Sequence, residues 1–453
     1  MKVKFVREIL KGTALLVSTL ALGSSFLRAE DSIRLQENFP EGYQYHVSCQ
    51  VNVAGSLSVP AEKEKTTSKQ LPIKGGSVID YDERILTANK TGQEKTLRIY
   101  RKVDFQRTVG DRPQEATIRP EVRRMVVLRL NQVEVPFSPD GPLLWGELDL
   151  VRTDVFTPAL AGLLPAGSVR PGDHWPAANS AVQELTDMVR IDQGQVECRL
   201  TEVTKVQNRR MARVRFSGTV IGLNEDGPNR QRLEGFFFFD LESNHLSFIT
   251  LNGTSMLLDK DGKEVGRVEG QFTLRRQINQ RNQDLSDQVV RGLKLEPTDD
   301  NTRLLYDNPD LGVRFLHPRR WKVMGVRGRQ LAVDDPNGNG LLLTLEPAAQ
   351  APTGAQYLRE SKDWLEKQKA KITALEPVRR LSSNQGEVEQ FALEIELPKE
   401  KAIMDYYVIR QTMGAVTIAA RLLPAQFSET RKDVENLAQS IVVTRRITAD
   451  EKR

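Results

Sequence analysis

The sequence is poor in the residues and motifs that identify enzymes and metal proteins. Its 453 residues include four histidines, His46, His174, His245 and His317, and none has a second His or a Cys at metal-ligand spacing. No serine lies in a G-x-S-x-G motif, and there is no phosphate-binding loop. We therefore predict a non-enzymatic protein with no catalytic residue, no metal site and no cofactor. A hydrolase with a site that the sequence does not reveal stays open as an alternative.

A long apolar run is also missing. A helix that spans a bilayer needs roughly 20 apolar residues, and the apolar stretch from Ala14 to Leu22 is much shorter. Four basic residues lie within the first eleven positions and small residues follow, which is the layout of a secretory signal peptide. We predict that residues 1–29 are a signal peptide, cleaved near Gly23 or Ala29. The protein would then be periplasmic or secreted, with no stable transmembrane segment in the mature chain.

After residue 29, charge of one sign is nowhere concentrated. The formal net charge is +5 at pH 7. Residues 1–29 carry five basic side chains and one acidic side chain, so the chain that follows has a formal charge of only about +1. Basic and acidic residues alternate there, as in "RESKDWLEKQKAK". This balance gives a nucleic acid no electrostatic attraction, and we expect no nucleic-acid partner.

Cysteine is scarce, with only Cys49 and Cys198. Neither follows the apolar N-terminal segment directly, which argues against a lipid anchor on cysteine. Both lie in alternating, strand-like stretches. Because the expected compartment is oxidising, a structural disulfide between Cys49 and Cys198 is the favoured interpretation. Two unpaired buried thiols are the alternative.

Most of the chain has the pattern of β-structure. Residues 30–277 contain many stretches such as "MVVLRLNQVEV" and "MARVRFSGTVIGL", in which apolar and charged residues alternate. This alternation is typical of antiparallel strands with one buried face. Asp-Gly pairs mark the turns between them. We predict a large, curved antiparallel β-domain over residues 30–277, interrupted by a helix at 156–167.

The four phenylalanines at 236–239 raise a question about this domain. In a strand, Phe237 and Phe239 point one way, and Phe236 and Phe238 point the other way. One pair belongs to the core. The second pair is either covered, by the 156–167 helix or by another domain, or lines a hydrophobic groove for a lipid or peptide.

The chain changes character after residue 277. Residues 278–301 are polar and read as a linker. Residues 302–446 combine short strands with two amphipathic helices, and residues 447–453 form a tail. The first of these helices places Tyr357, Leu358, Ser361, Trp364 and Leu365 on one face. Together the two domains predict the α+β class, with an α/β/α sandwich following the β-domain.

Two stretches resemble known families. The pattern Phe315-x-x-Pro318-x-x-Trp321 and the order of elements after it resemble the PsbP-like α/β/α domain. The segments "LLPAGSVRPGDHW" and "GFFFFDLESNHLSFITLNG" resemble uncharacterised exported bacterial proteins of the planctomycete type, whose curved sheets are loosely similar to the lipoprotein-carrier half-barrel. These resemblances imply a binding or assembly protein of the envelope, with an envelope protein or a hydrophobic ligand as partner. A lipid or lipoprotein carrier that uses the concave sheet is the alternative.

One stretch, "DPNGNGLLLTLE" at 335–346, matches a calcium-loop pattern. The residues on both sides are strand-like, however. If residues 341–346 are extended, Glu346 lies on the order of 17–20 Å beyond the turn and cannot share an ion with Asp335. We predict a hairpin turn. In the same way, Asp240 and His245 are expected to be partners in a surface hairpin and not a catalytic dyad.

Overall fold

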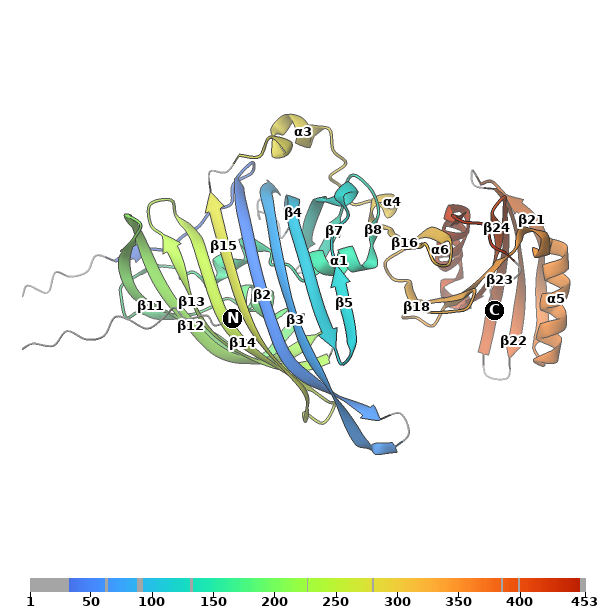
Figure 1. The fold of residues 1–453 in the computed structure, drawn as a ribbon, viewed down its shortest axis with the longest axis horizontal. Helices are drawn as coiled ribbons and strands as arrows, with labels where there is room; N and C mark the ends of the chain where they lie inside the picture. Colours follow the sequence, from blue (N-terminus) through green and yellow to red (C-terminus); the bar gives the residue numbers. More distant parts are fainter. Residues whose placement is uncertain are drawn as a thin grey trace, which may run out of the picture.

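The computed structural model describes residues 32–448, apart from 62–63, 88–92, 131–132, 226, 279–280, 384–385 and 398–399. It confirms the α+β class, with two large antiparallel sheets and few helices (Figure 1). The predicted signal peptide at 1–29 lies outside the described residues. Among the residues that are described, no helix is long and apolar enough to cross a membrane.

The described part of the N-terminal domain forms a sheet of 12 strands. Its strands in spatial order are β10 (His174–Pro176), β11 (Arg190–Val206), β12 (Arg209–Asn224), β13 (Gly227–Asp240), β14 (His245–Leu258), β15 (Glu264–Ile278), β2 (Gln44–Ala61), β3 (Glu64–Thr87), β4 (Gln93–Val109), β6 (Arg124–Leu130) and β7 (Val133–Phe137), with β5 (Arg112–Ala116) paired to β4. All of these pairs are antiparallel, and apolar residues alternate with polar ones along most strands. The sheet has β10 and β7 as its two ends. A short pair, β1 (Ile33–Arg34) and β9 (Ser168–Val169), lies apart from it.

One cross-strand row of this sheet is rich in glycine. The row crosses the strands in the order Gly75, Val53 of β2, Gly270, Gly253, Leu233 of β13 and Gly218. A Cβ atom added at Gly218 would collide with the carbonyl oxygen of Gln195 on the neighbouring strand. Glycine is therefore required where backbones approach this closely, and such a row lets a sheet curl. Figure 1 shows the strands coiling strongly toward the end where β2 and β3 project.

The concave face of the sheet is covered by α1 (Trp145–Arg152), η2 (Thr157–Leu163) and α2 (Asn179–Thr186). Another 3-10 turn, η1 (Pro120–Val122), precedes β6. The predicted helix at 156–167 is the 3-10 helix η2, which has Pro158 in its first turn. Trp175 lies in the same core and donates its indole N–H to the Leu163 carbonyl at 2.9 Å. These elements therefore close part of the concave face.

A buried ionic network fastens this covering layer to the sheet. The guanidinium of Arg98 donates to Glu83 at 2.7 Å and to Asp154 at 3.0 Å, and all three side chains are shielded from solvent. Thr157 donates to Glu83 at 2.8 Å. Burial alone would raise the pKa of Glu83, but the charge of Arg98 holds it below its usual value. Burial raises the pKa of Asp154 to about 6, against the effect of Arg98.

The segment predicted to be a linker packs more closely than we expected. It contains η3 (Gln283–Leu285), α3 (Asp287–Arg291) and α4 (Asp299–Thr302). Its Leu285 is fully buried in a cluster with Leu97, Val126 and Phe137 of the β-domain, which the polar character of the segment did not indicate. Its carbonyl also accepts a hydrogen bond from Arg84 at 2.6 Å. This part of the segment therefore follows the surface of the β-domain and is held by it.

The C-terminal domain is the predicted sandwich, with helices on both faces of a sheet. Its seven strands are β18 (Lys322–Arg327), β19 (Gln330–Asp334), β20 (Gly340–Glu346), β24 (Gly414–Leu422), β23 (Glu400–Gln411), β22 (Glu387–Leu397) and β21 (Lys371–Leu381), in spatial order. Helix α6 (Phe427–Ser440) packs on one face, and α5 (Gly354–Lys367) packs on the other. Short turns η4 (Ala348–Gln350) and η5 (Pro424–Gln426) precede the two helices.

A small sheet joins the two domains. Its order is β25 (Val442–Val443), β17 (Val313–His317), β16 (Leu304–Asn308) and β8 (Leu143–Leu144), and β8 belongs to the N-terminal domain. Leu304 of β16 is buried in the core of the N-terminal domain. Lys322 lies over the Trp145 ring at 5.4 Å. The domains therefore touch through both backbone and side chains.

Candidate functional site

The predicted disulfide between Cys49 and Cys198 is wrong. Both thiols are free and buried. Cys49 lies on β2 and Cys198 on β11, and β12, β13, β14 and β15 separate these strands in the sheet. Adjacent strands lie about 4.8 Å apart, whereas a disulfide needs Cα atoms within about 7 Å. The two cysteines serve as core residues, and burial raises the pKa of Cys198 to about 12.

The loop with the calcium-like pattern is the predicted hairpin turn. It joins β19 to β20, with Asp334 and Gly340 in register at its base. The Asp335 carboxylate accepts hydrogen bonds from the backbone amides of Asn337 and Asn339, each at 2.9 Å. Glu346 lies at the far end of β20, opposite Ala415. Within the described residues, no cluster of three or more His, Cys, Asp or Glu side chains is arranged to hold a metal ion.

The four phenylalanines of β13 divide as their alternation predicts. Phe237 and Phe239 are fully buried in the core under the covering layer. Phe236 and Phe238 lie on the outer face, half-buried, and form a cluster with Phe248 at ring distances of 5.6 to 6.2 Å. The guanidinium of Arg213 lies 4.7 Å from the Phe236 ring. The outward pair is therefore covered mainly by its own neighbours, and we assign it no ligand.

One arrangement on the outer face was missed from the sequence. His46 lies between Asp82, at 3.0 Å from its Nδ1, and the Ser48 hydroxyl, at 3.2 Å from its Nε2. This order of groups is that of a serine nucleophile with its base. The Ser48 hydroxyl, however, donates to Asp80 at 2.9 Å, and strand pairing occupies the backbone here. The cluster lacks the free nucleophile and the amide pair that acyl transfer requires.

Asp240 and His245 are partners in a hairpin turn, as predicted. Asp240 accepts hydrogen bonds from the amides of Glu242 and Ser243 at 2.9 and 3.1 Å, which is a turn-stabilising role. His245 is not on the surface, because it is buried beneath the turn. Burial lowers the pKa of His245 to about 4. His245 is therefore neutral at physiological pH and contributes to packing.

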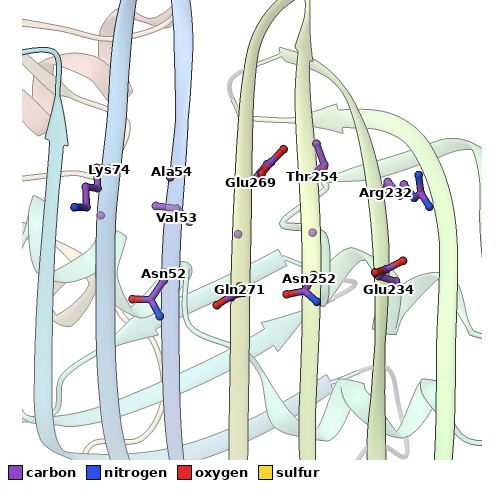
Figure 2. Close-up of a pocket in the computed structure, with 13 residues that line it drawn as sticks. Asn52, Val53, Ala54, Lys74, Arg232, Glu234, Asn252, Thr254, Glu269 and Gln271 are labelled. Atoms are coloured by element: carbon purple, nitrogen blue, oxygen red, sulfur yellow. The ribbon is translucent and has the colours of Figure 1, made fainter. Parts of the chain in front are cut away.

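A broad polar depression of about 710 Å³ lies on the outer face of the sheet (Figure 2). Two adjacent cross-strand rows supply its side chains. One row contains Asn52, Gln271, Asn252 and Glu234, and the other contains Lys74, Ala54, Glu269, Thr254 and Arg232. Two positive and two negative side chains balance, and all nine stand on the face opposite the core. This surface can form hydrogen bonds, but it has the composition of an ordinary hydrated sheet face.

An apolar groove in the C-terminal domain is the stronger candidate. Helix α5 covers the side of the sheet around β21 and β22 and leaves β19, β20 and β24 open on the same face. The groove has a volume of about 580 Å³. Its floor is a single cross-strand row, Ala332, Leu342, Ala419 and Tyr406. The two alanine side chains are small, so the floor of the groove stays close to the backbone of the sheet. A bulky apolar group can therefore approach the sheet here.

Aromatic side chains make one wall of the groove rigid. Tyr357 of α5 meets the Tyr406 ring edge to face at 5.3 Å, and Tyr406 stacks on Phe391 at 4.8 Å. Trp364, two turns further along α5, lines the groove with 55% of its surface exposed, and Leu342 on the floor is 40% exposed. Exposed apolar side chains that gather in one patch are typical of surfaces that contact another molecule.

Charged residues stand around the apolar floor. Asp334 and Glu360 lie at the rim, and Arg421 also borders the groove. Arg421 forms an ion pair with Glu400. The rim therefore offers two carboxylates that an incoming basic side chain can contact.

Sequence reasoning placed Trp364 on the packed face of its helix, together with Leu358 and Leu365. Leu365 is buried, but Trp364 extends past the strands that the helix covers. The periodicity of the helix gave no sign of this, because it does not tell how many strands a single helix covers.

Comparisons with known proteins show only remote similarity. No family model and no curated protein matches the sequence. The solved structure of cyanobacterial PsbP (CyanoP) from Synechocystis sp. PCC 6803 has 12% identity and a TM-score of 0.26, over 31% of this chain and 92% of that one. Lipovitellin has 10% identity and a TM-score of 0.29, over 54% of this chain and 26% of that one. MucB, solved in complex with MucA, has 10% identity and a TM-score of 0.15, over 89% and 94% of the two chains.

These similarities are too weak to show a family or a function. We therefore base the proposed function on the groove and its side chains.

Proposed function

We propose that this protein is an exported, non-enzymatic binding protein, and that the groove beside α5 holds an amphipathic helix of an envelope protein. The observation that carries the proposal is the open half of the sheet face, where Trp364 and Leu342 are exposed next to an aromatic wall. The export of the protein rests on the signal-peptide pattern of residues 1–29.

A helix fits this space for a geometric reason. The seven strands of the sheet are about 29 Å across, whereas packed helices lie 8–10 Å apart, so that one helix cannot cover the face. A second helix laid beside α5 would complete the layer and bury Trp364 and Leu342. Recognition of this kind places apolar residues at i, i+3, i+4 and i+7 in the groove. The carboxylates of Asp334 and Glu360 at the rim favour a helix with basic residues beside its apolar stripe.

The alternative of a lipid carrier is less well supported. A carrier needs an open concave surface, and α1, η2 and α2 pack against the concave face of the large sheet with the buried network between them. A carrier would have to use the glycine-rich end of the sheet that these elements leave uncovered.

The fluorescence of Trp364 reports binding in this test, because the other three tryptophans, Trp145, Trp175 and Trp321, are more buried. A synthetic amphipathic helix of Leu and Lys should shift the Trp364 emission to shorter wavelength and bind with a Kd in the micromolar range. A matched peptide of Leu and Glu should bind at least tenfold more weakly. Leu342→Glu should abolish binding of the basic peptide without unfolding the domain, because Leu342 is already partly exposed.

The control variant is Met413→Glu, which also places a carboxylate at an exposed apolar position but lies in the turn between β23 and β24 and not among the lining residues of the groove. It should bind like the natural protein. Equal binding of the acidic and basic peptides, or undiminished binding by Leu342→Glu, would show that the groove does not hold such a helix. Co-purified lipid seen by native mass spectrometry would favour the carrier.

A further inference from the structure

A second pocket lies at the edge of the large sheet, far from the groove in the sequence. Its volume is about 340 Å³. The edge strand β7 forms one wall, the end of α1 and the C-terminal part of α2 form others, and the β12–β13 turn reaches its rim. The Arg152–Glu225 ion pair spans from the end of α1 to that turn. We call this the edge pocket.

The carboxylates of the edge pocket outnumber its cations. Its charged lining residues are Arg129, Glu134, Arg152, Asp154, Glu184, Asp187 and Glu225. Most of the carboxylates have partners. Glu184 forms an ion pair with Arg129 at 2.9 Å, Asp154 forms one with Arg98 at 3.0 Å, and Glu225 pairs with Arg152.

Glu134 of β7 is the exception. Its Oε2 atom is shielded from solvent and has no hydrogen-bond partner. Arg129 is directly opposite Glu134 in the strand register, but the guanidinium of Arg129 is ion-paired with Glu184. A carboxylate oxygen that is withdrawn from water without a partner costs free energy, which is recovered when a cation reaches it.

One part of the rim of the edge pocket is apolar. Val133 and Val189 both line it, with 63% and 65% of their surfaces exposed, and Met188 lies beside them. A ligand that enters past these side chains would place aliphatic groups against the valines and its end against Glu134. The natural match is a positive group on an aliphatic stem.

We propose that the edge pocket binds a primary ammonium group carried on an aliphatic stem, and that Glu134 supplies the carboxylate that contacts it. Free alkylamines and the lysine side chain of a protein share this chemistry. A divalent metal ion is a poorer match, because no cluster of three or more ligating side chains is found in the part of the chain that the structure describes.

Proton release should accompany binding. Burial, and then the neighbouring charge of Glu184, raise the pKa of Glu134 to about 8, so that its carboxyl group is mostly neutral at pH 7. The charged groups that face it are Arg129 from β6, Glu184 from α2, Asp154 after α1 and Arg98 from β4. An alkylammonium keeps its charge up to a pKa of about 10. Affinity should therefore rise between pH 6.5 and pH 8.5, as Glu134 loses its proton.

The experiment is a calorimetric titration of the whole protein with n-pentylammonium chloride, with n-pentanol as the neutral probe and a short lysine-containing peptide as the second source of the group. The natural protein should bind pentylammonium more tightly at pH 8.5 than at pH 6.5. Glu134→Gln should weaken binding at least tenfold at pH 8.5 and remove the pH dependence. This variant keeps the shape of the side chain and replaces a carboxyl group whose Oε2 atom has no hydrogen-bond partner, so it should fold.

Glu202→Gln is the matched control, because Glu202 is an exposed carboxylate on β11, paired with Arg213, outside the edge pocket. It should bind like the natural protein. If only the peptide binds, and Glu134→Gln abolishes that binding, the ligand is a protein side chain; if the free amine binds in the same way, it is a small amine. The proposal fails if neither probe binds, if Glu134→Gln binds unchanged, or if pentanol binds as well as pentylammonium.

Discussion

Removal of Arg98 should destabilise the N-terminal domain more than removal of any surface arginine. The substitution Arg98→Met keeps an unbranched side chain of similar length and deletes the charge. It leaves Glu83 and Asp154 buried without their shared cation. It also takes away the hydrogen bond from Arg98 to the Val155 carbonyl, at 3.1 Å, between α1 and η2.

The magnitude follows from the burial of the three groups. Loss of one partner from a buried ion pair costs about 3–5 kcal/mol, because the remaining charge stays out of water. For a unit of 150–250 residues, each kcal/mol lowers Tm by about 2–4 °C, which predicts a decrease of about 6–20 °C. Without Arg98, the pKa values of both carboxyl groups are higher in the folded state than in the unfolded state. The folded state then binds more protons than the unfolded state, and a lower pH stabilises it. The loss should therefore be largest above pH 7 and smaller at pH 5.

The assay is thermal and urea unfolding, followed by circular dichroism at pH 8 and pH 5. Arg190→Met is the control on β11 of the same sheet, because both side chains of the Arg190–Asp192 ion pair are exposed, at 67% and 45%. Exposed pairs contribute about 0–1 kcal/mol. A loss below 1 kcal/mol for Arg98→Met, or an equal loss at both pH values, would refute the role assigned to the network.

Two further outcomes are expected. Millimolar calcium should leave Tm unchanged, because the Asp335 carboxylate already accepts hydrogen bonds from the loop. A ligand that binds only the folded protein, at 100 times its Kd, adds about 2.7 kcal/mol to the free energy of unfolding, which a Tm measurement detects. A rise in Tm that Asp335→Ala abolishes would contradict the turn. Alkylation of the unfolded, unreduced protein should modify both Cys49 and Cys198, whereas the folded protein should react slowly because both thiols are buried. A peptide map that shows the two joined would overturn their separation in the sheet.

Local sequence patterns predicted the secondary-structure elements better than they predicted which elements pack or pair together. Alternation identified the strands of the large sheet and the split of Phe236 and Phe238 from Phe237 and Phe239. The Asp335 turn followed from its strand-like flanks. Each of these features depends on residues close in the sequence. The amphipathic pattern of α5 likewise predicted a helix with one face on a sheet.

Features that depend on spatial order were not predictable. The pairing of cysteines requires the order of strands, which places four strands between Cys49 and Cys198. The polar segment after β15 gave no sign that Leu285 fills a cluster on the β-domain. Glu134 is a single charged residue in a short strand, and only the folded arrangement shows that its neighbour Arg129 is committed to Glu184.

The central pairing of β2 with β15 has a consequence for how the chain folds. β2 ends at Ala61 and β15 begins at Glu264, so the two halves of the large sheet join only when residues about 200 positions apart meet. Contacts between residues so far apart in the sequence slow folding. Until β15 has been synthesised, one edge of β2 stays open and can pair with other chains. A nascent chain therefore cannot complete this sheet, and the edge of β2 that pairs with β15 stays open, until residue 278 is available.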